Sequence, residues 1–478
     1  MKKASIKIGL APTRRNVFSR EDSLKYKKLI ERKLREWKVS FVNINWLNDE
    51  GLLYSGAEAV QVARRFREEG VDAVFAPHCN FGTEDAVAKL ASAVGKPFLL
   101  WGPRDEAPLP DGLRLRDTQC GLFATSKILR RLGVPFTYIV NSRVDSRVFE
   151  RGFKSFVAVA AAANAVIGAR IGQVGTRPPG FWTVMVNEGE LLERWGIQVV
   201  PTTLVEIVDS VEKKLRARPR KLRDTIAQFK KTASFGDLGD EVVAKLAALK
   251  LALAEWAQKE ALDGIAFQCW DALQVALGVV PCFVYGELTG EGLPLACETD
   301  IHGAVTSAML QAAAMNTAPT FFADLTIRHP EDENAELLWH CGPFPSALAD
   351  EKESCKVGKH RILPAGAPGC GEWKIKGGDV TIARFDGDHG DYSLLIGEAT
   401  GTRGPRTHGT YLWVKVKNWP AWEEKIIYGP YIHHVVGVHG RLAPILYEAC
   451  KYIPGLQPDP IEPTAEAIRA YWRGDDLR

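Results

Sequence analysis

Acidic residues and histidines recur in four short segments in the second half of the chain. In order, these are ACETDIHGAVT around Glu298, FFADLT around Asp324, LLWHCGPFP around His340, and YIHHVVGVHG around His433 and His434. Carboxylate oxygens and imidazole nitrogens together suit Mn²⁺ and similar divalent cations. A cation held in this way can polarise a carbonyl group, so the segments predict metal-assisted chemistry on an oxygen-rich substrate.

Asp324 stands within an apolar run, Phe321 to Leu325, that is typical of a buried strand. A lone carboxylate in such a strand is costly unless a strong partner, such as a cation, compensates for its charge. We therefore favour a functional role for Asp324 over a buried salt bridge.

Glu298 follows a loop rich in glycine and proline at residues 290–294 and precedes a long apolar stretch. We expect it to open a helix that extends to Met315, with its carboxylate in the first turn near the positive end of the helix dipole. That placement would keep Glu298 ionised and able to bind a metal ion, although a carboxylate there can also serve only the helix end. His302, one helical turn later, is a further candidate ligand.

His433 and His434 are adjacent residues of a predicted strand. Neighbouring side chains on a strand point to opposite faces, so at most one of the two easily reaches a given metal ion. The residue types alone do not decide which one.

The composition indicates a globular protein that acts on small molecules. Of the 478 residues, 46% are hydrophobic and 25% are charged, and the net charge is +3 with no dominant run of lysine and arginine. This argues against nucleic-acid and membrane partners. The apolar stretch near the N-terminus is too short for a signal peptide, and no run approaches about 18 apolar residues. We therefore expect a cytoplasmic protein.

Several common sites are absent from the sequence. It has no GxxxxGK[ST] motif, no GxGxxG motif after a predicted strand and no HExxH motif, which removes most of the support for ATP and dinucleotide chemistry. The nine cysteines form no CxxC pair, so we expect reduced thiols rather than a zinc ribbon or a disulfide framework. The acidic stretch 386–391 lacks the spacing of a calcium loop and predicts a hairpin turn.

Short apolar runs alternate with longer amphipathic stretches over the first third of the chain. The runs predict strands at 6–10, 39–44, 73–76 and 97–101, each followed by an amphipathic stretch. This rhythm is typical of βαβ units around a parallel sheet. Ligands of such sheets bind beyond the carboxyl ends of the strands, so His78 is a candidate contact at the lip of a pocket. Its alternative role is to cap the next helix.

A second α/β region follows, and the last third is rich in predicted strands. Arg177 lies in a loop of glycine and proline after one strand of the second region, and Trp270 follows another. The tail from Pro454 is expected to be an extended surface segment. We therefore predict an α/β fold of two doubly wound parallel-sheet domains followed by a β-rich, barrel-like C-terminal domain. The predicted domains are residues 1–145, residues 146–317 with Glu298, and residues 318–478 with Asp324 and the late histidines.

The ordered segments closely resemble the L-fucose isomerase family. The resemblance rests on ACETDIHGAVT, preceded by FQCWDALQ and a proline–cysteine pair at 281–282, and followed by Asp324 and WHCG. It covers residues 264–439, the upstream α/β regions fit that family's N-terminal domains, and L-arabinose isomerases are more distantly similar. The resemblance implies that Glu298, Asp324 and His434 bind Mn²⁺, with Mg²⁺ or Co²⁺ as other candidates, and that His340 is a substrate contact or an outer ligand.

The implied activity is the interconversion of an open-chain aldose and a ketose through an enediolate. A bound cation would polarise the carbonyl, and Glu298 and Asp324 would shuttle a proton between C2 and C1. His78 and His433 are further candidate substrate contacts. Candidate walls for the sugar are Trp270, Trp339 and Phe344. Arg177 is a candidate contact for a sugar hydroxyl or for the anionic group of a modified sugar.

Two other functions fit the same residues. One is a metal-dependent sugar epimerase or aldol-type lyase on this scaffold, and the other is a non-catalytic sugar-binding protein. The family resemblance also implies a homo-oligomer, a trimer or a hexamer, with active sites shared between subunits. By that resemblance, His78 and the segment Gln119-Cys120 would complete the pocket of another subunit.

Overall fold

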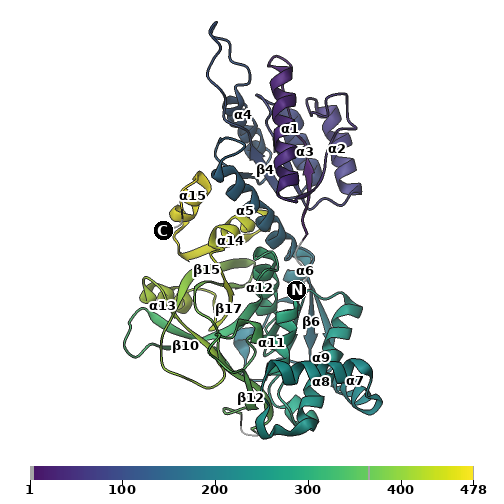
Figure 1. The fold of residues 1–478 in the computed structure, drawn as a ribbon, viewed down its shortest axis with the longest axis vertical. Coiled ribbons are helices and arrows are strands. Elements are labelled where there is room, and N and C mark those ends of the chain that lie inside the picture. Colours follow the sequence, from purple (N-terminus) through teal and green to yellow (C-terminus); the bar gives the residue numbers. More distant parts are fainter. Residues whose placement is uncertain (1–4, 364–365, 477–478) are drawn as a thin grey trace. The chain divides into compact units, whose positions relative to one another are not determined.

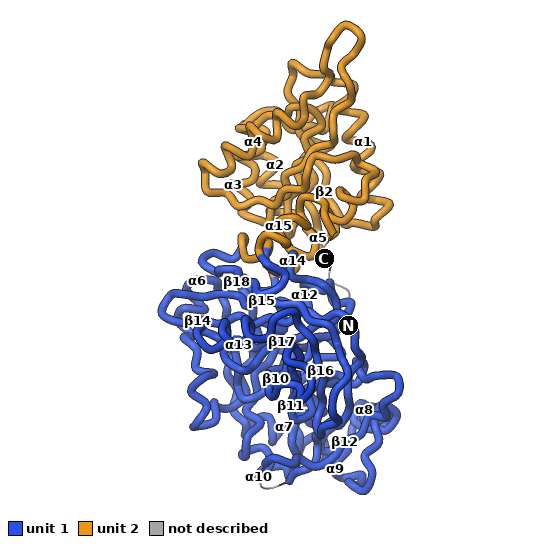
Figure 2. The backbone as a smooth tube through the Cα atoms, turned by 90° about the vertical axis from the view of Figure 1, so that its left-hand side faces the viewer, with its two compact units in different colours: residues 1–3, 165–447, 453–464 blue, residues 4–164, 448–452, 465–478 orange. Residues whose placement is uncertain are grey.

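The computed structural model describes residues 5–363 and 366–476. These residues form two compact units, drawn in different colours in Figure 2. The small unit consists of residues 5–164, 448–452 and 465–476, and the large unit of residues 165–447 and 453–464. The domain borders expected from the sequence, after residues 145 and 317, stay predictions.

The small unit is built on a five-stranded parallel sheet with strand order β2-β1-β3-β4-β5. Its elements are β1 (Lys7–Leu10), α1 (Arg20–Glu36), β2 (Ser40–Val42), α2 (Gly56–Glu68), β3 (Ala73–Pro77), α3 (Glu84–Val94), β4 (Phe98–Trp101), α4 (Thr118–Arg131), β5 (Thr137–Tyr138) and α5 (Arg147–Asn164). Apolar residues of α2, α3 and α4 form one buried cluster with the sheet, and those of α1 and α5 form another. Helices therefore cover both faces, as a doubly wound fold requires.

The large unit begins with a second parallel sheet, in strand order β7-β6-β8-β9. Its elements are β6 (Arg170–Val174), α6 (Glu188–Trp195), β7 (Gln198–Thr202), α7 (Leu204–Ala217), α8 (Arg220–Thr232), α9 (Gly239–Glu260), β8 (Gly264–Phe267), α10 (Ala272–Leu277), α11 (Cys282–Glu291), β9 (Leu295–Cys297) and α12 (Ile301–Ala313). Helix α12 is buried between this sheet and the next one, since it packs against β8 and β9 as well as β14 and β17 (Figure 1).

The rest of the large unit is a nine-stranded sheet that closes on itself (Figure 1). Its strands are β10 (Thr320–Arg328), β11 (Ala335–His340), β12 (Lys356–Lys359), β13 (Pro368–Lys374), β14 (Asp379–Asp388), β15 (Asp391–Thr402), β16 (Thr410–Lys415), β17 (His434–His439) and β18 (Leu456–Glu462). Antiparallel pairing runs β16-β11-β10-β17-β14-β15, and β15 pairs with β16 again to close a barrel. The predicted architecture, two parallel-sheet α/β regions and a barrel-like C-terminal region, is confirmed.

The remaining elements lie mostly near the C-terminus, where the structure differs from the sequence-based expectation. They are the helices α13 (Trp419–Tyr428), α14 (Ala443–Ala449) and α15 (Ala465–Arg473) and the 3₁₀ turns η1 (Trp182–Val184), η2 (Gly236–Leu238), η3 (Ser346–Leu348) and η4 (Cys450–Tyr452). The tail is not an extended surface segment, because β18 pairs in parallel with β15 and α15 follows it. The predicted hairpin turn is confirmed, with Asp388 opposite Asp391 in the β14–β15 pair. Among the described residues, no helix has both the length and the apolar character needed to cross a membrane.

Candidate metal centre and active site

The barrel brings the predicted site segments together at neighbouring strands. Asp324 of β10 is paired with His434 of β17 on one side and with Trp339 of β11 on the other. His340 is the last residue of β11, and Glu298 directly follows β9. Strand register therefore places Asp324, His434 and Trp339 next to one another, and the end of the parallel sheet supplies Glu298.

Glu298 does not lie in the first turn of a helix, contrary to the sequence-based expectation. Glu298 and Thr299 have φ angles of 61° and 60°, a left-handed conformation that non-glycine residues adopt at a cost. Helix α12 begins only at Ile301, and Asp300 is its N-cap, accepting a hydrogen bond from the backbone N–H of Gly303 at 2.8 Å. The strained turn therefore directs the Glu298 carboxylate toward the barrel, while Asp300 satisfies the helix end.

Atoms that could bind a metal ion converge at the site from three residues. The Nε2 atom of His434 lies 3.2 Å from Oε2 of Glu298 and 3.5 Å from Oδ1 of Asp324. These side chains are little exposed, with 1% of His434, 10% of Glu298 and 18% of Asp324 accessible to solvent. Within the described residues, Asp324 Oδ1 and His434 Nε2 are buried without a hydrogen-bond partner. Such orphaned atoms beside a second carboxylate fit a divalent cation, which would satisfy all of them.

His433 and His340 also border this centre. The rings of His433 and His434 lie 4.4 Å apart, and a ligand atom from each lies within 4.8 Å of one from Asp324. They are not separated on opposite faces, because β17 begins at His434 and the strand alternation does not extend to His433. His340 forms a second such group with Glu298 and His434, and its Nε2 atom lies 3.8 Å from Asp324 Oδ1.

The charges at the centre are strongly coupled. Burial alone would raise the pKa of Glu298, but the imidazole of His434, 3.2 Å away, outweighs the effect of burial and lowers this pKa. Burial raises the pKa of Asp324 in spite of the neighbouring imidazoles. The pKa of His434 is raised to about 9, because the hydrogen bond to Asp300 and the nearby carboxylates of Glu298 and Asp324 outweigh the effect of burial. In the absence of a cation, the protonated imidazole thus neutralises part of the carboxylate charge.

A buried network supports His434 from behind, and the sequence analysis did not identify it. The Oδ2 atom of Asp300 accepts hydrogen bonds from Nδ1 of His434, at 2.9 Å, and from the guanidinium of Arg384. The same guanidinium donates to Asp386 Oδ2 at 2.8 Å, and Asp386 Oδ1 lies 3.0 Å from Nδ1 of His302. His302 is therefore part of this network rather than directed at the metal centre. Asp300 could have been found from its place in the CETD segment, whereas nothing in the strand pattern distinguishes Arg384.

Trp270 and the loop that carries Arg177 lie beside the strained turn. The indole N–H of Trp270 donates to Oε1 of Glu298 at 2.9 Å, which fixes that carboxylate. The hydroxyl of Thr299 donates to the carbonyl oxygen of Thr176 at 3.2 Å, and this tie places the Arg177 loop next to the turn. Within the described residues, Arg177 bonds only to the carbonyl oxygens of residues 178 and 179 and forms no ion pair. An unneutralised cation thus lies on the loop that borders the site.

Known families match both ends of the chain. Residues 9–167 match the N-terminal domain of fucose/sulfoquinovose isomerase, and residues 338–455 match the C-terminal domain of L-fucose isomerase. The chain belongs to the L-fucose isomerase family. It is accordingly a sugar isomerase, as the sequence resemblance implied.

The relatives of this isomerase include proteins named sulfoquinovose isomerase. That of Priestia aryabhattai is 27% identical over 340 residues, which are 70% of this chain and 74% of the relative. That of Alkalicoccus urumqiensis is 26% identical over 347 residues, 72% of this chain and 76% of the relative. A solved ABC transporter solute-binding protein from Actinobacillus succinogenes with bound D-allose is 11% identical, and the match covers 65% of this chain and 88% of that chain with a TM-score of 0.17. A likeness that weak carries no argument.

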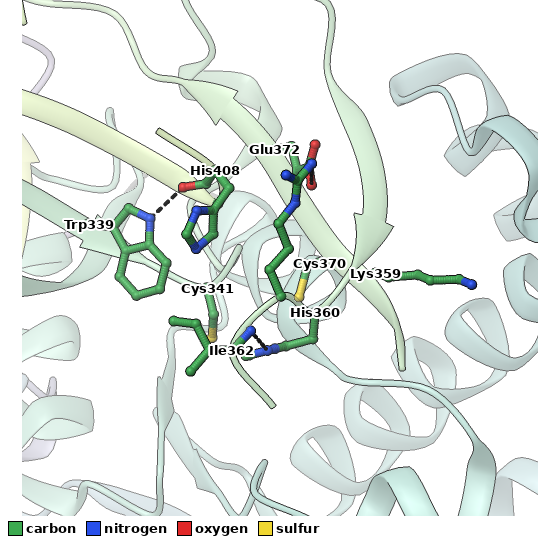
Figure 3. A pocket seen from close by; sticks show the side chains of 10 residues that line it. Trp339, Cys341, Lys359, His360, Ile362, Cys370, Glu372 and His408 are labelled. Carbon is green, nitrogen blue, oxygen red and sulfur yellow. Dashed lines mark hydrogen bonds and ion pairs between the residues drawn. The ribbon is translucent and has the colours of Figure 1, made fainter. Parts of the chain in front are cut away.

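A narrow cavity lies beside strand β11 of the isomerase (Figure 3). Trp339, Cys341, His360 and His408 are among its lining side chains, and its volume is about 10 Å³. That is room for about one water molecule, so the cavity does not admit a sugar. Trp339 therefore faces this cavity and packs parallel to the His340 ring at 6.2 Å.

Two residues considered as substrate contacts are buried instead. Phe344 is fully buried and its ring packs 4.9 Å from that of Phe321, so it belongs to the barrel core. His78 is fully buried in the small unit, where burial lowers its pKa to about 4. It does not cap the next helix, since Thr83 is the N-cap of α3, and its Nδ1 atom bonds to the carbonyl oxygen of Phe81 at 2.8 Å.

Proposed function

We propose that the protein is a Mn²⁺-dependent aldose–ketose isomerase that acts on the open-chain form of an anionic sugar. The observation that carries this proposal is the convergence of Glu298, Asp324 and His434, with both carboxylates within 3.5 Å of His434 Nε2. Two carboxylates and one imidazole suit Mn²⁺, and Mg²⁺ and Co²⁺ are the other candidates.

The side chains divide the proposed chemistry among them. A divalent cation bound here supplies Lewis-acid polarisation of the sugar carbonyl and its neighbouring hydroxyl. Glu298 and Asp324 are the proposed acid–base pair that moves the proton between C2 and C1. Asp324 is the better placed to take the proton, because burial raises its pKa and its Oδ1 atom accepts no hydrogen bond from the described residues. Glu298 is held by the indole N–H of Trp270, and its chief proposed role is to bind the cation.

Arg177 supports an anionic substrate. Sulfoquinovose, the sugar in the names of the relatives, carries a sulfonate group, and an arginine without an ion-pair partner is suited to bind one. Trp270 lines an open groove together with Phe181 and the prolines of the Arg177 loop, and this groove has the size of a small-molecule site. We propose that the anionic end of the sugar lies against Arg177, with Trp270 and His433 as further contacts and the C1–C2 end at the metal centre.

The activity is tested with purified protein, Mn²⁺ and sulfoquinovose in D₂O. We expect metal-dependent exchange of the C2 proton and formation of the ketose, both followed by NMR, and we expect Glu298→Gln to lose both. Exchange with a different product would point instead to an epimerase or a lyase. Binding without exchange in the parent protein would contradict catalysis altogether.

The substrate class is tested with Arg177→Met and with Arg177→Lys, which keeps the charge. Loss of a charged hydrogen bond costs about 1.5–3 kcal/mol, so KM for sulfoquinovose should rise about 10- to 100-fold in Arg177→Met and less in Arg177→Lys. Glucose, which lacks the sulfonate, serves as the matched substrate, and its KM should not change. An equal change in KM for both sugars would show that Arg177 does not recognise the anionic group.

We further propose that the enzyme is a homo-oligomer, a trimer or a hexamer, and that it acts in the cytoplasm. Both follow from the sequence considerations and the family to which the chain belongs. Light scattering coupled to size exclusion measures the mass of the particle, and a mass equal to one chain would refute the first part.

A further inference from the structure

Hydrogen bonds fix which nitrogen of His434 carries the proton. Its Nδ1 atom lies 2.9 Å from Oδ2 of Asp300, and that carboxylate is fully buried and paired with Arg384. An ionised carboxylate only accepts hydrogen bonds, so Nδ1 carries the hydrogen. The Nε2 atom of the neutral ring then has a free lone pair, which faces Glu298 and Asp324 and is suited to a metal ion.

His340 has the opposite arrangement. The backbone N–H of Cys341 donates to Nδ1 of His340 at 2.9 Å, and the Cys341 thiol lies 3.2 Å from the same atom. A ring nitrogen that accepts a hydrogen bond carries no hydrogen, so the hydrogen of the neutral ring is on Nε2. Within the described part of the chain, this Nε2 atom is buried and has no hydrogen-bond partner.

We propose that His340 is a catalytic hydrogen-bond donor to the substrate and not a ligand of the metal ion. Its Nε2–H would donate to the sugar oxygen at the C1–C2 end, on which negative charge develops as the enediolate forms. The proposal that His340 contacts a substrate rests on the proposed isomerase activity. The division of roles between His340 and His434 rests on the hydrogen bonds of their rings.

The position of His340 supports this role. Its Nε2 atom lies 3.8 Å from Oδ1 of Asp324, the proposed proton carrier, so a sugar oxygen near that carboxylate is also near the imidazole N–H. A metal ion at Nε2 would require the hydrogen to move to Nδ1, where it would oppose the N–H of Cys341. A fixed donor in a buried site stabilises developing charge without reorganisation. The geometry thus favours His434 as the ligand and His340 as the donor.

The test separates metal binding from turnover in three variants. His340→Leu removes the donor, His340→Gln supplies an amide N–H in its place, and His434→Gln removes the proposed ligand. Titration calorimetry with Mn²⁺ alone should give affinities within about 3-fold of the parent for both His340 variants and a loss of more than about 10-fold for His434→Gln. Thermal unfolding of each variant checks that it is folded.

Turnover gives the second readout. We expect kcat to fall about 100-fold or more in His340→Leu and to recover at least about tenfold in His340→Gln, with little change in KM. A loss of Mn²⁺ affinity in both His340 variants equal to that of His434→Gln would overturn the proposal, and so would an unchanged kcat in His340→Leu. If the parent protein isomerises no sugar, the proposed function and the donor role both fail, whereas the Mn²⁺ titrations still decide which histidine is the ligand.

Discussion

Replacement of Asp300 by asparagine tests how the barrel orients His434, the proposed metal ligand. The Oδ1 atom of Asp300 accepts the backbone N–H of Gly303, and Oδ2 accepts both His434 and Arg384. Asparagine can keep the helix cap through its carbonyl oxygen, but its NH₂ group then faces two donors. His434 can avoid that conflict only by moving its hydrogen to Nε2, the atom that faces the metal centre.

Two effects of known size follow from this replacement. Breaking a buried ion pair by removing one partner costs about 3–5 kcal/mol, so the urea midpoint of the metal-free protein should fall. Loss of the group that orients a metal-binding histidine lowers metal affinity about 10- to 100-fold, equivalent to about 1.4–2.8 kcal/mol. Titration calorimetry with Mn²⁺ measures the second effect directly.

Asp386→Asn is the matched control. Asp386 is also buried and also accepts a hydrogen bond from Arg384, but it contacts His302 instead of His434. We therefore expect a comparable loss of stability with Mn²⁺ affinity within about 3-fold of the parent. Parental Mn²⁺ affinity in Asp300→Asn, or an equal loss in both variants, would refute the argument that Asp300 acts through the orientation of His434.

Three other outcomes follow from single contacts. Trp270→Phe keeps the ring but loses the N–H bond to Glu298, so kcat/KM should fall about 10- to 100-fold, and a parental value would contradict the fixing of that carboxylate. Burial raises the pKa of Glu336 from 4.5 to about 7, so the folded state favours the protonated carboxyl group. The stabilisation that this protonation provides is complete below pH 4.5 and is lost as the pH rises through 7. Glu336→Gln should therefore flatten the fall in melting temperature between pH 5 and pH 8, and an unchanged slope would remove this residue as its cause. A Cβ at Gly437 would lie 2.1 Å from the Phe321 ring, so Gly437→Ala should lower the free energy of unfolding by about 1–3 kcal/mol in urea titration. An unchanged free energy of unfolding would show that the barrel accommodates the methyl group without cost.

Residue types in the sequence predicted which side chains would gather at the candidate site, because the chemistry of a metal site restricts them. A carboxylate within an apolar strand needs a strong partner, and that argument selected Asp324, whose Oδ1 atom lies 3.5 Å from His434 Nε2. The functional role of Asp324 stays a prediction. The alternation of apolar runs likewise predicted the parallel sheets and the strands of the barrel, since side-chain periodicity reflects which face is buried. The position of Glu298 was predicted less well, because two left-handed residues before a helix leave no clear pattern in a sequence without glycine there.

The different roles of the histidines could be read only from the tertiary structure. His434 owes its orientation to Asp300, 134 residues earlier in the chain, and Asp300 is in turn paired with Arg384, 84 residues later. His340 owes its opposite orientation to the adjacent backbone N–H of Cys341. The sequence by itself predicted that carboxylates and imidazoles of distant segments would gather at one site, and the structure brings Glu298, Asp324 and His434 together. Only the fold decided which nitrogen faces that site, because a hydrogen-bond partner is a matter of proximity in space and not of residue type.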